Sequence, residues 1–137
     1  MNIETVKDML IANEGMVLHS YKDHLGLDTI GVGRLIHEGK GGLTEEEAKY
    51  LLENDIGRVI DRLDRNFPWW RDLSENRQHI MIDLSFNLGN RLSKFVNFLS
   101  SLEAGDYAAA SEHLLDSKYA RQVSNRANRN AKLIREG

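Results

Sequence analysis

Two carboxylates and a hydroxyl fall within sixteen residues near the start of the chain, at Glu14, Asp23 and Thr29. This set suits the hydrolysis of a glycosidic bond with inversion. In that reaction one carboxylic acid protonates the leaving oxygen, and a carboxylate on the opposite face of the sugar activates water. A hydroxyl can help to hold that water. Spacing alone is weak evidence, because acidic residues are usually solvated surface charges.

Hydrophobic periodicity and glycine predict the elements that position these residues. Apolar residues at helical spacing predict a helix over residues 1–13. Residues 18–32 combine short alternating pieces with glycines, which predicts a small twisted hairpin or a three-stranded sheet. Glu14 would then lie where a helix ends and the sheet begins, a position that opposes the helix dipole. Apolar Met16 and Val17 beside it favour a desolvated carboxyl, which suits a proton donor.

The rest of the chain reads as helices. Thr44 to Glu47 form a capping box, and the apolar residues that follow predict a helix of about 20 residues, roughly 30 Å long. A Phe-Pro-Trp-Trp sequence breaks it, and we interpret the tryptophan pair as a plug under the turn rather than a sugar-stacking platform. The segment from Ile80 to Leu88 is apolar almost all round and predicts a buried central helix. Further helices are predicted over residues 95–102, 107–115 and 117–133.

Composition excludes several classes of protein. A length of 137 residues with 41% hydrophobic residues suits one globular domain. The absence of cysteine excludes a disulfide framework and a thiolate metal site, and the five histidines lack metal-ligand spacing. No apolar run approaches the ~20 residues of a membrane span. The first ten residues are amphipathic and carry acids, so we do not expect them to act as a secretory signal.

Charge is unevenly distributed. The net charge is −3, but residues 118–137 carry +5 and residues 1–117 carry −8. A basic segment can contact an anionic polymer such as nucleic acid or cell wall. Because the basic residues recur at helical intervals and do not cluster, we favour a solvated helix face that complements an acidic body.

The residues around the carboxylates are more specific than their spacing. From Glu14 to Gly33 the chain reads E-G-x5-Y-K-D-x5-T-I-G-V-G, which resembles the catalytic segment of phage endolysins of the T4 lysozyme type. Shorter matches follow in the order that the family has them. They are L-T-x-x-E-A at 43–48, F-N-L-G at 86–89 and N-R-A-N-R at 125–129. The resemblance covers nearly the whole chain.

The resemblance implies an α+β fold that is mostly α, with two lobes, a small N-terminal sheet and a long interlobe helix. It places one lysozyme domain over residues 1–137. The sheet-containing lobe would span about residues 14–55. The helical lobe would span about residues 56–137 and include the N-terminal helix 1–13.

The resemblance also implies the site residues. Glu14 falls on the family's essential acid, Asp23 on its second acidic residue and Thr29 on its threonine. This gives a general acid, a base or electrostatic partner, and a residue that positions water. No metal or cofactor is implied.

Family positions that line the sugar cleft are matched elsewhere in the chain. Leu35 and Phe86 match two of them, although core packing is an equal alternative for Phe86. Arg126 falls on the arginine near the catalytic acid, where a structural role is an equal alternative. Phe98 and His113 stand where the T4 enzyme has smaller polar residues, so their role as substrate-binding residues is open.

The implied activity is that of a muramidase, an endolysin that hydrolyses the β-1,4 bond between N-acetylmuramic acid and N-acetylglucosamine in peptidoglycan and causes host cell lysis. One alternative is a lytic transglycosylase on the same fold, which needs a single acid. Another is a non-catalytic cell-wall-binding protein. Binding to nucleic acid is disfavoured, because no recognition motif is present.

We expect a monomer that binds peptidoglycan, with no nucleic acid and no membrane insertion. It would remain in the host cytoplasm until a separate membrane-permeabilising protein released it to the cell wall.

The chain departs from the T4 enzyme in places. Arg34 replaces a histidine, the connection from Ile36 to Leu43 is much shorter, and little chain follows Arg129. The T4 enzyme has a His–Asp salt bridge at the positions of Arg34 and Asp55. We therefore expect Arg34 to pair with Asp55.

Overall fold

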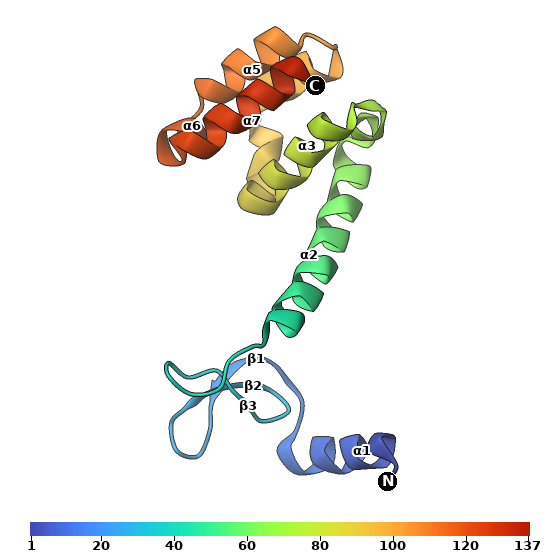
Figure 1. The fold of residues 1–137 in the computed structure, drawn as a ribbon, viewed down its shortest axis with the longest axis vertical. Coiled ribbons are helices and arrows are strands. Elements are labelled where there is room, and N and C mark those ends of the chain that lie inside the picture. Colours follow the sequence, from blue (N-terminus) through green and yellow to red (C-terminus); the bar gives the residue numbers. More distant parts are fainter. The chain divides into compact units, whose positions relative to one another are not determined.

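Helices dominate the computed structural model of residues 1–137, and one three-stranded antiparallel sheet completes it. This confirms the expected α+β, mostly helical architecture with a small sheet near its start (Figure 1). The chain divides into two units, Met1–Leu51 and Leu52–Gly137. The assignment of the N-terminal helix to the helical lobe stays a prediction.

Helix α1, Ile3–Glu14, opens the first unit. The Asn2 side chain caps it by accepting a hydrogen bond from the Thr5 amide at 3.2 Å, which satisfies one free N–H of the first turn. The helix ends at Gly15, whose φ of 76° favours glycine. The Gly15 amide donates to the Ile11 carbonyl at 2.8 Å. Glu14 is thus the last helical residue.

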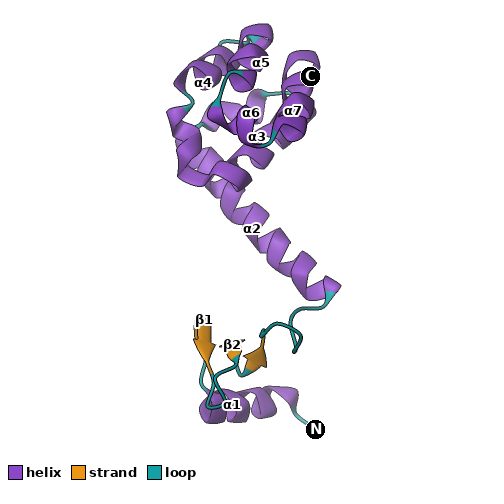
Figure 2. Cartoon of the chain, turned by 90° about the vertical axis from the view of Figure 1, so that its left-hand side faces the viewer, coloured by secondary structure: helices purple, strands orange, loops and turns teal.

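The sheet follows directly, in the order β1-β2-β3. Its strands are β1, Val17–Lys22, β2, Asp28–Gly31, and β3, Arg34–Leu35. The register of β1 against β2 shifts between Val17 and Tyr21, which pair with Gly31 and Thr29. Figure 2 shows the strands within the N-terminal unit. Thr29 lies in the middle strand, paired with Tyr21 on one side and Leu35 on the other.

The short glycine-rich loop that leaves the sheet folds back onto β3. The Gly42 amide donates to the Leu35 carbonyl at 2.8 Å. A Cβ on Gly41 would lie 2.1 Å from the same carbonyl oxygen, closer than any side chain tolerates. The backbone can approach Leu35 in this way only because residue 41 is glycine.

Helix α2, Glu45–Asn66, crosses the boundary between the two units. The predicted capping box is confirmed, because the Thr44 hydroxyl accepts from the Glu47 amide at 3.1 Å and Glu47 Oε1 accepts from the Thr44 amide at 2.9 Å. A 3₁₀ helix, Pro68–Asp72, follows. Within it Trp70 is buried and donates from Nε1 to Asp64 Oδ1 at 2.7 Å. Trp70 is therefore the expected plug.

The second unit is otherwise helical. Its remaining elements are α3, Glu75–Leu88, a 3₁₀ helix, Gly89–Lys94, α4, Val96–Glu103, α5, Tyr107–Leu115, α6, Lys118–Gln122, and α7, Ser124–Glu136. The single helix expected over residues 117–133 is wrong. Val123, with φ −134° and ψ 55°, is not helical and separates α6 from α7.

The hydrophobic core lies wholly in the second unit. Helix α3 supplies its centre, as predicted, and α5 packs against both α4 and α7 (Figure 2). Helices α5 and α7 can approach each other closely because small residues, Ala110, Ala127 and Ala131, lie almost fully buried on them. The Ser111 hydroxyl donates to the Ala131 carbonyl at 2.9 Å across the α5–α7 contact. No helix combines the length and apolar character needed to cross a membrane.

Candidate active site

Glu14 projects from the end of α1 over the turn between β2 and β3. A Cβ on Gly33 would lie 3.1 Å from Glu14 Oε2, so the missing side chain at Gly33 makes room for the carboxylate. Within the first unit Glu14, Met16 and Val17 are all exposed. Met16 and Val17 therefore do not bury the Glu14 carboxyl within the first unit. The expectation that these two residues desolvate it is wrong.

Asp23 begins the loop that joins β1 to β2, and its carboxylate organises that loop. Asp23 Oδ1 accepts hydrogen bonds from the Leu25 amide at 2.8 Å and the Leu27 amide at 2.9 Å. The Asp23 amide in turn donates to the Leu27 carbonyl at 2.9 Å. Oδ2 accepts no hydrogen bond from the protein and is left to contact a solvent molecule or substrate.

These contacts hold Asp23 in its charged form. The hydrogen bond from the Leu27 amide is the largest cause that lowers the pKa of Asp23, and the Leu25 amide adds to it. Burial opposes the shift, while His24 and His37 contribute by their charge. Asp23 is thus a carboxylate at neutral pH, as a base or electrostatic partner must be.

Thr29 is the one buried residue of the first unit, with 2% of its surface exposed. Its Oγ1 donates to the Leu27 carbonyl at 2.8 Å. With the hydroxyl proton directed there, the lone pairs of Oγ1 remain available to accept a hydrogen bond. Asp23 and Thr29 are therefore anchored to the same residue, Leu27.

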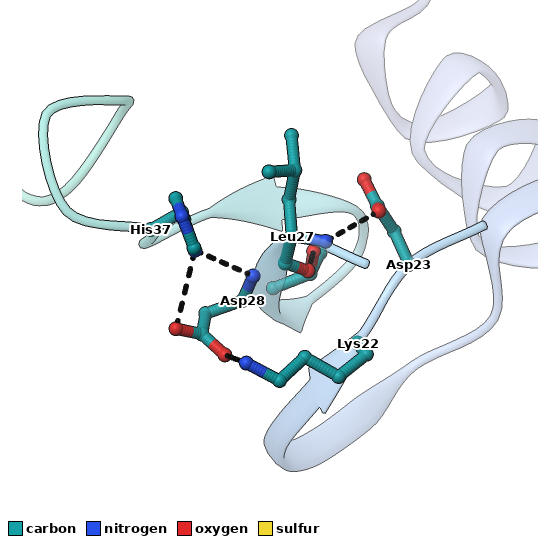
Figure 3. A network of polar contacts seen from close by, with 6 residues as sticks. Lys22, Asp23, Leu27, Asp28 and His37 are labelled. Atoms are coloured by element: carbon teal, nitrogen blue, oxygen red, sulfur yellow. Dashed lines mark hydrogen bonds and ion pairs between the residues drawn. The ribbon is translucent and has the colours of Figure 1, made fainter. Parts of the chain in front are cut away.

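A second polar cluster lies beside this loop (Figure 3). Lys22 on β1 pairs with Asp28 Oδ1 on β2. His37 Nδ1 lies 3.3 Å from Asp28 Oδ2 and also 3.3 Å from the Asp28 amide, which donates to it. The hydrogen bond and charge of Lys22 lower the pKa of Asp28, with a smaller contribution from His37.

Arg34 does not have the partner that we expected. It donates from Nη1 to Glu47 Oε1 at 2.8 Å and from Nη2 to Glu47 Oε2 at 2.5 Å, whereas Asp55 pairs with Arg58. The predicted Arg34–Asp55 pair is wrong. The short connection brings β3 to the first turn of α2, and Asp55 lies eight residues further along that helix, about 12 Å away.

In the second unit Arg126 is held by Asp83 of α3. Arg126 Nε donates to Asp83 Oδ2 at 3.0 Å and Nη2 donates to Oδ1 at 2.5 Å. Asn130 Nδ2 donates to the same carboxylate at 2.7 Å and contacts the Tyr119 hydroxyl at 3.0 Å. Burial raises the pKa of Asp83, but the bonds from Arg126 and Asn130 outweigh it and hold the pKa below its usual value. The charge of Arg126 is thereby balanced within its own unit.

The other expected substrate-binding residues are divided between the two units. Leu35 lies on β3 of the first unit. Phe86, 47% exposed, and Arg126 line one hollow of about 370 Å³ on the second unit, with Asp83. His113 lines another, of about 480 Å³, and Phe98 forms part of that wall although it is buried in the core.

Sequence reasoning missed the residues that hold these groups in place, chiefly Lys22, Asp28, His37 and Asp83. Lys22 and Asp28 flank the Asp23 loop symmetrically, so a hairpin register would have paired them. Asp83 sits among apolar residues of the central helix, and a charge in such a segment indicates a buried partner. No cluster of three His, Cys, Asp or Glu side chains is arranged to hold a metal ion.

Comparison with known proteins decides the family. The family model described as phage lysozyme matches residues 12–132, nearly the whole chain. The chain belongs to the phage lysozyme family. This confirms the resemblance found in the sequence, and the chain is a glycosidase of the lysozyme kind.

Individual relatives agree with the family match. A probable T4-type lysozyme of Dictyostelium discoideum is 28% identical over 98% of this lysozyme and 96% of its own length. An endolysin of Acyrthosiphon pisum secondary endosymbiont phage 1 is 29% identical over 74% of this chain and 69% of its own. The pre-baseplate central spike protein Gp5 of Enterobacteria phage T4 is 28% identical over 97% of this chain, which spans only 28% of that protein.

Proposed function

We propose that this lysozyme is an inverting muramidase, which hydrolyses the β-1,4 bond between N-acetylmuramic acid and N-acetylglucosamine in peptidoglycan. Glu14 would act as general acid on the glycosidic oxygen. Asp23 would act as the base or electrostatic partner, and Thr29 would position the attacking water. The family match supports the glycosidase chemistry, and the local geometry supports these three roles.

The observation that carries the proposal is the state of Asp23. Its Oδ1 is committed to two backbone amides, its charge is stabilised, and its Oδ2 is free. A fixed, ionised carboxylate with one free oxygen suits the activation of a water molecule. Thr29 Oγ1, which donates its proton to the carbonyl of Leu27 two residues earlier, can accept a hydrogen bond from the same water.

In an inverting enzyme the water must fit between the sugar and the base. The carboxyl groups of Glu14 and Asp23 should then lie roughly 6.5–9.5 Å apart around the bound sugar. A covalent intermediate would instead need about 5–5.5 Å. The anomer first released from a defined glycan, read by NMR, distinguishes the two mechanisms: inversion supports the proposal and retention contradicts it.

A product assay separates the alternatives. Hydrolysis releases a reducing end, whereas a lytic transglycosylase releases a 1,6-anhydro end and a wall-binding protein releases neither. We expect purified peptidoglycan to yield reducing ends, and Glu14→Gln to abolish them. Formation of anhydro ends by the wild-type protein would replace the muramidase assignment with the transglycosylase.

We also propose the biological setting. The protein would act as a monomer on bacterial peptidoglycan, lyse the host cell, and stay in the host cytoplasm until a separate membrane-permeabilising protein releases it. Cells that express it should therefore remain intact until their inner membrane is permeabilised, and then lose turbidity. Lysis without permeabilisation would contradict this arrangement.

A further inference from the structure

The peptide group that joins Leu27 to Asp28 is hydrogen-bonded at both ends. Its carbonyl, from Leu27, accepts from Thr29 Oγ1 at 2.8 Å and from the Asp23 amide at 2.9 Å. Its N–H, from Asp28, donates to His37 Nδ1 at 3.3 Å. A peptide group is planar and rigid. Any rotation that takes the N–H away from His37 also turns the carbonyl away from the Thr29 hydroxyl.

His37 Nδ1 faces two partners but can bond only one of them at a time. It lies 3.3 Å from the Asp28 amide and 3.3 Å from Asp28 Oδ2 (Figure 3). A neutral ring with its proton on Nε2 accepts from the amide, whereas a ring protonated at Nδ1 can only donate, and the carboxylate is then its partner. The protonation state of His37 therefore selects between the backbone and the side chain of Asp28.

The charges around His37 keep the Asp28 carboxylate ionised, so both the carboxylate and the Asp28 amide can bind His37. Lys22 from β1 binds the other carboxylate oxygen of Asp28 and holds the pKa of Asp28 below its usual range. Asp28 is thus ionised throughout the range in which histidine ordinarily titrates, near pH 6.5. Asp23 in the β1–β2 loop lies within reach of the charges of both His24 and His37. On the segment of His37 itself, Glu38 follows directly and the Lys40 amide donates to the His37 carbonyl.

We propose that His37 is a positioning residue for the Thr29 hydroxyl, and that protonation of His37 slows hydrolysis by releasing the N–H end of the Leu27–Asp28 peptide. The inference rests on the proposed function, in which Thr29 holds the attacking water. Neutral His37 holds the N–H end of the peptide while the Asp23 amide holds its carbonyl, and together they fix the direction of the Leu27 carbonyl. Thr29 then directs its proton there and keeps a lone pair for the water. Charged His37 no longer accepts from the peptide, which is then held only at its carbonyl, by the Asp23 amide and the Thr29 hydroxyl, and can tilt about that end.

Two substitutions separate this role from a structural one. His37→Asn places an amide oxygen near the site of Nδ1, so it retains an acceptor but cannot be protonated in this range. His37→Phe keeps a ring of similar size and removes the acceptor. His24→Asn is the matched control, because His24 also acts on Asp23 by its charge but does not contact the Leu27–Asp28 peptide. Circular dichroism checks that each variant folds.

The kinetic test measures kcat and KM on purified peptidoglycan between about pH 5 and 9, the range in which histidine titrates. We expect the wild-type kcat to fall by about threefold to tenfold on acidification, the usual worth of one hydrogen bond, with little change in KM. His37→Asn should lose this fall and His37→Phe should be slow at every pH. His24→Asn should retain the wild-type profile.

A second readout does not depend on activity. The backbone amide proton of Asp28 should shift in NMR spectra with the same midpoint as the His37 ring, and the shift should disappear in His37→Asn. Two results from an active wild-type protein would overturn the inference alone. One is a fall of kcat in acid that persists in His37→Asn, and the other is an Asp28 amide shift whose midpoint differs from that of the His37 ring. A wild-type protein that releases no reducing ends overturns the proposed function, and the kinetic role of His37 with it.

Discussion

Arg34 and Glu47 form a two-point ion pair that ties β3 to the first turn of α2, with nitrogen–oxygen distances of 2.8 and 2.5 Å. The same carboxylate accepts from the Thr44 amide at 2.9 Å. Glu47 thus binds both Arg34 at the end of the sheet and the Thr44 amide at the start of α2. The hydrogen bonds from Arg34, followed by that from the Thr44 amide, lower the pKa of Glu47 from 4.5 to about 2.

The start of α2 should consequently lose stability in acid through Glu47. Because its folded pKa is depressed, its contribution is complete above about pH 4.5 and disappears as pH falls toward 2. Glu47→Gln should lower the melting temperature and speed hydrogen exchange at the Ala48 amide at pH 6, and these differences should vanish near pH 2. Glu46→Gln, in the same turn but unpaired, is the control. Equal effects of the two substitutions would contradict a specific role for the pair.

Glu14→Gln should abolish lysis and leave the fold intact. Loss of a general acid usually lowers the rate ~10²–10⁴-fold, and the side chain is exposed within its unit, so its replacement should not disturb packing. Clearing of permeabilised Gram-negative cells measures activity, and thermal unfolding measures stability. Clearing near the wild-type rate would refute the assignment of Glu14.

Asp23→Asn should distinguish the role of Asp23 in holding the β1–β2 loop from its role in catalysis. An asparagine oxygen can still accept from the Leu25 and Leu27 amides, but the charge is gone. We expect a loss of activity of ~10²-fold or more with an unfolding transition close to wild type. Asp28→Asn provides a comparison, because it removes a neighbouring charge without touching those amides. If Asp28→Asn were as damaging to kcat as Asp23→Asn, Asp23 would have no special place in catalysis.

Asp83 should matter for stability because two polar groups depend on it. Asp83→Ala leaves Arg126 and Asn130 without their shared acceptor, and we expect a loss of about 1–3 kcal/mol in the free energy of unfolding by urea. The loss should shrink in acid as the wild-type carboxyl becomes protonated, since its folded pKa lies below the ordinary 3.8. Asp72→Ala, an exposed acid that makes no such bonds, should change little. A similar loss from both would argue against the network.

Wall binding should depend on the basic C-terminal segment more than on net charge. Ions screen exposed charges over ~8–10 Å at physiological salt, so a bound glycan strand responds to local charge. Neutralising Lys118, Arg121 and Lys132 to Gln should raise the apparent KM for cell walls severalfold and flatten its salt dependence.

The matched control for that experiment needs acids without structural partners. Asp64 is unsuitable, because it accepts hydrogen bonds from Trp70 and Arg71. Neutralising Glu53, Asp61 and Glu103, which are exposed and unpaired, should have little effect on lysis. If both triple variants change KM and salt response equally, the basic segment is only a solvated helix face.

Sequence reasoning succeeded where one local signal decided an element. The capping box at Thr44 predicted the start of α2. The apolar residues on nearly every side of residues 80–88 predicted that α3 lies in the core. Periodicity failed at Val123, because one non-helical residue between two amphipathic segments hardly disturbs a period of 3.6. The break depends on how α6 and α7 pack, which is tertiary information.

The sequence predicted the reacting groups of the site but not the residues that hold them in place. Glu14, Asp23 and Thr29 belong to one contiguous motif, whereas His37 reaches Asp28 only through the register of a sheet. The Arg34 prediction failed for a related reason. A pairing taken from a relative with a longer connection does not transfer when the shorter loop brings a different carboxylate, Glu47, within reach.

The last helix has a consequence for how the chain is made. Ala127, Ala131 and Ile134 of α7 are among the most deeply buried residues of the core, while α1 buries no residue. Synthesis proceeds from the N-terminus at about 5–20 residues per second, so the apolar faces of α3, α4 and α5 emerge well before the helix that covers them. The second unit therefore lacks part of its core until α7 has emerged. Nascent chains stalled before Ala127 should therefore be sensitive to protease and bind chaperones, whereas chains released after Ile134 should be resistant.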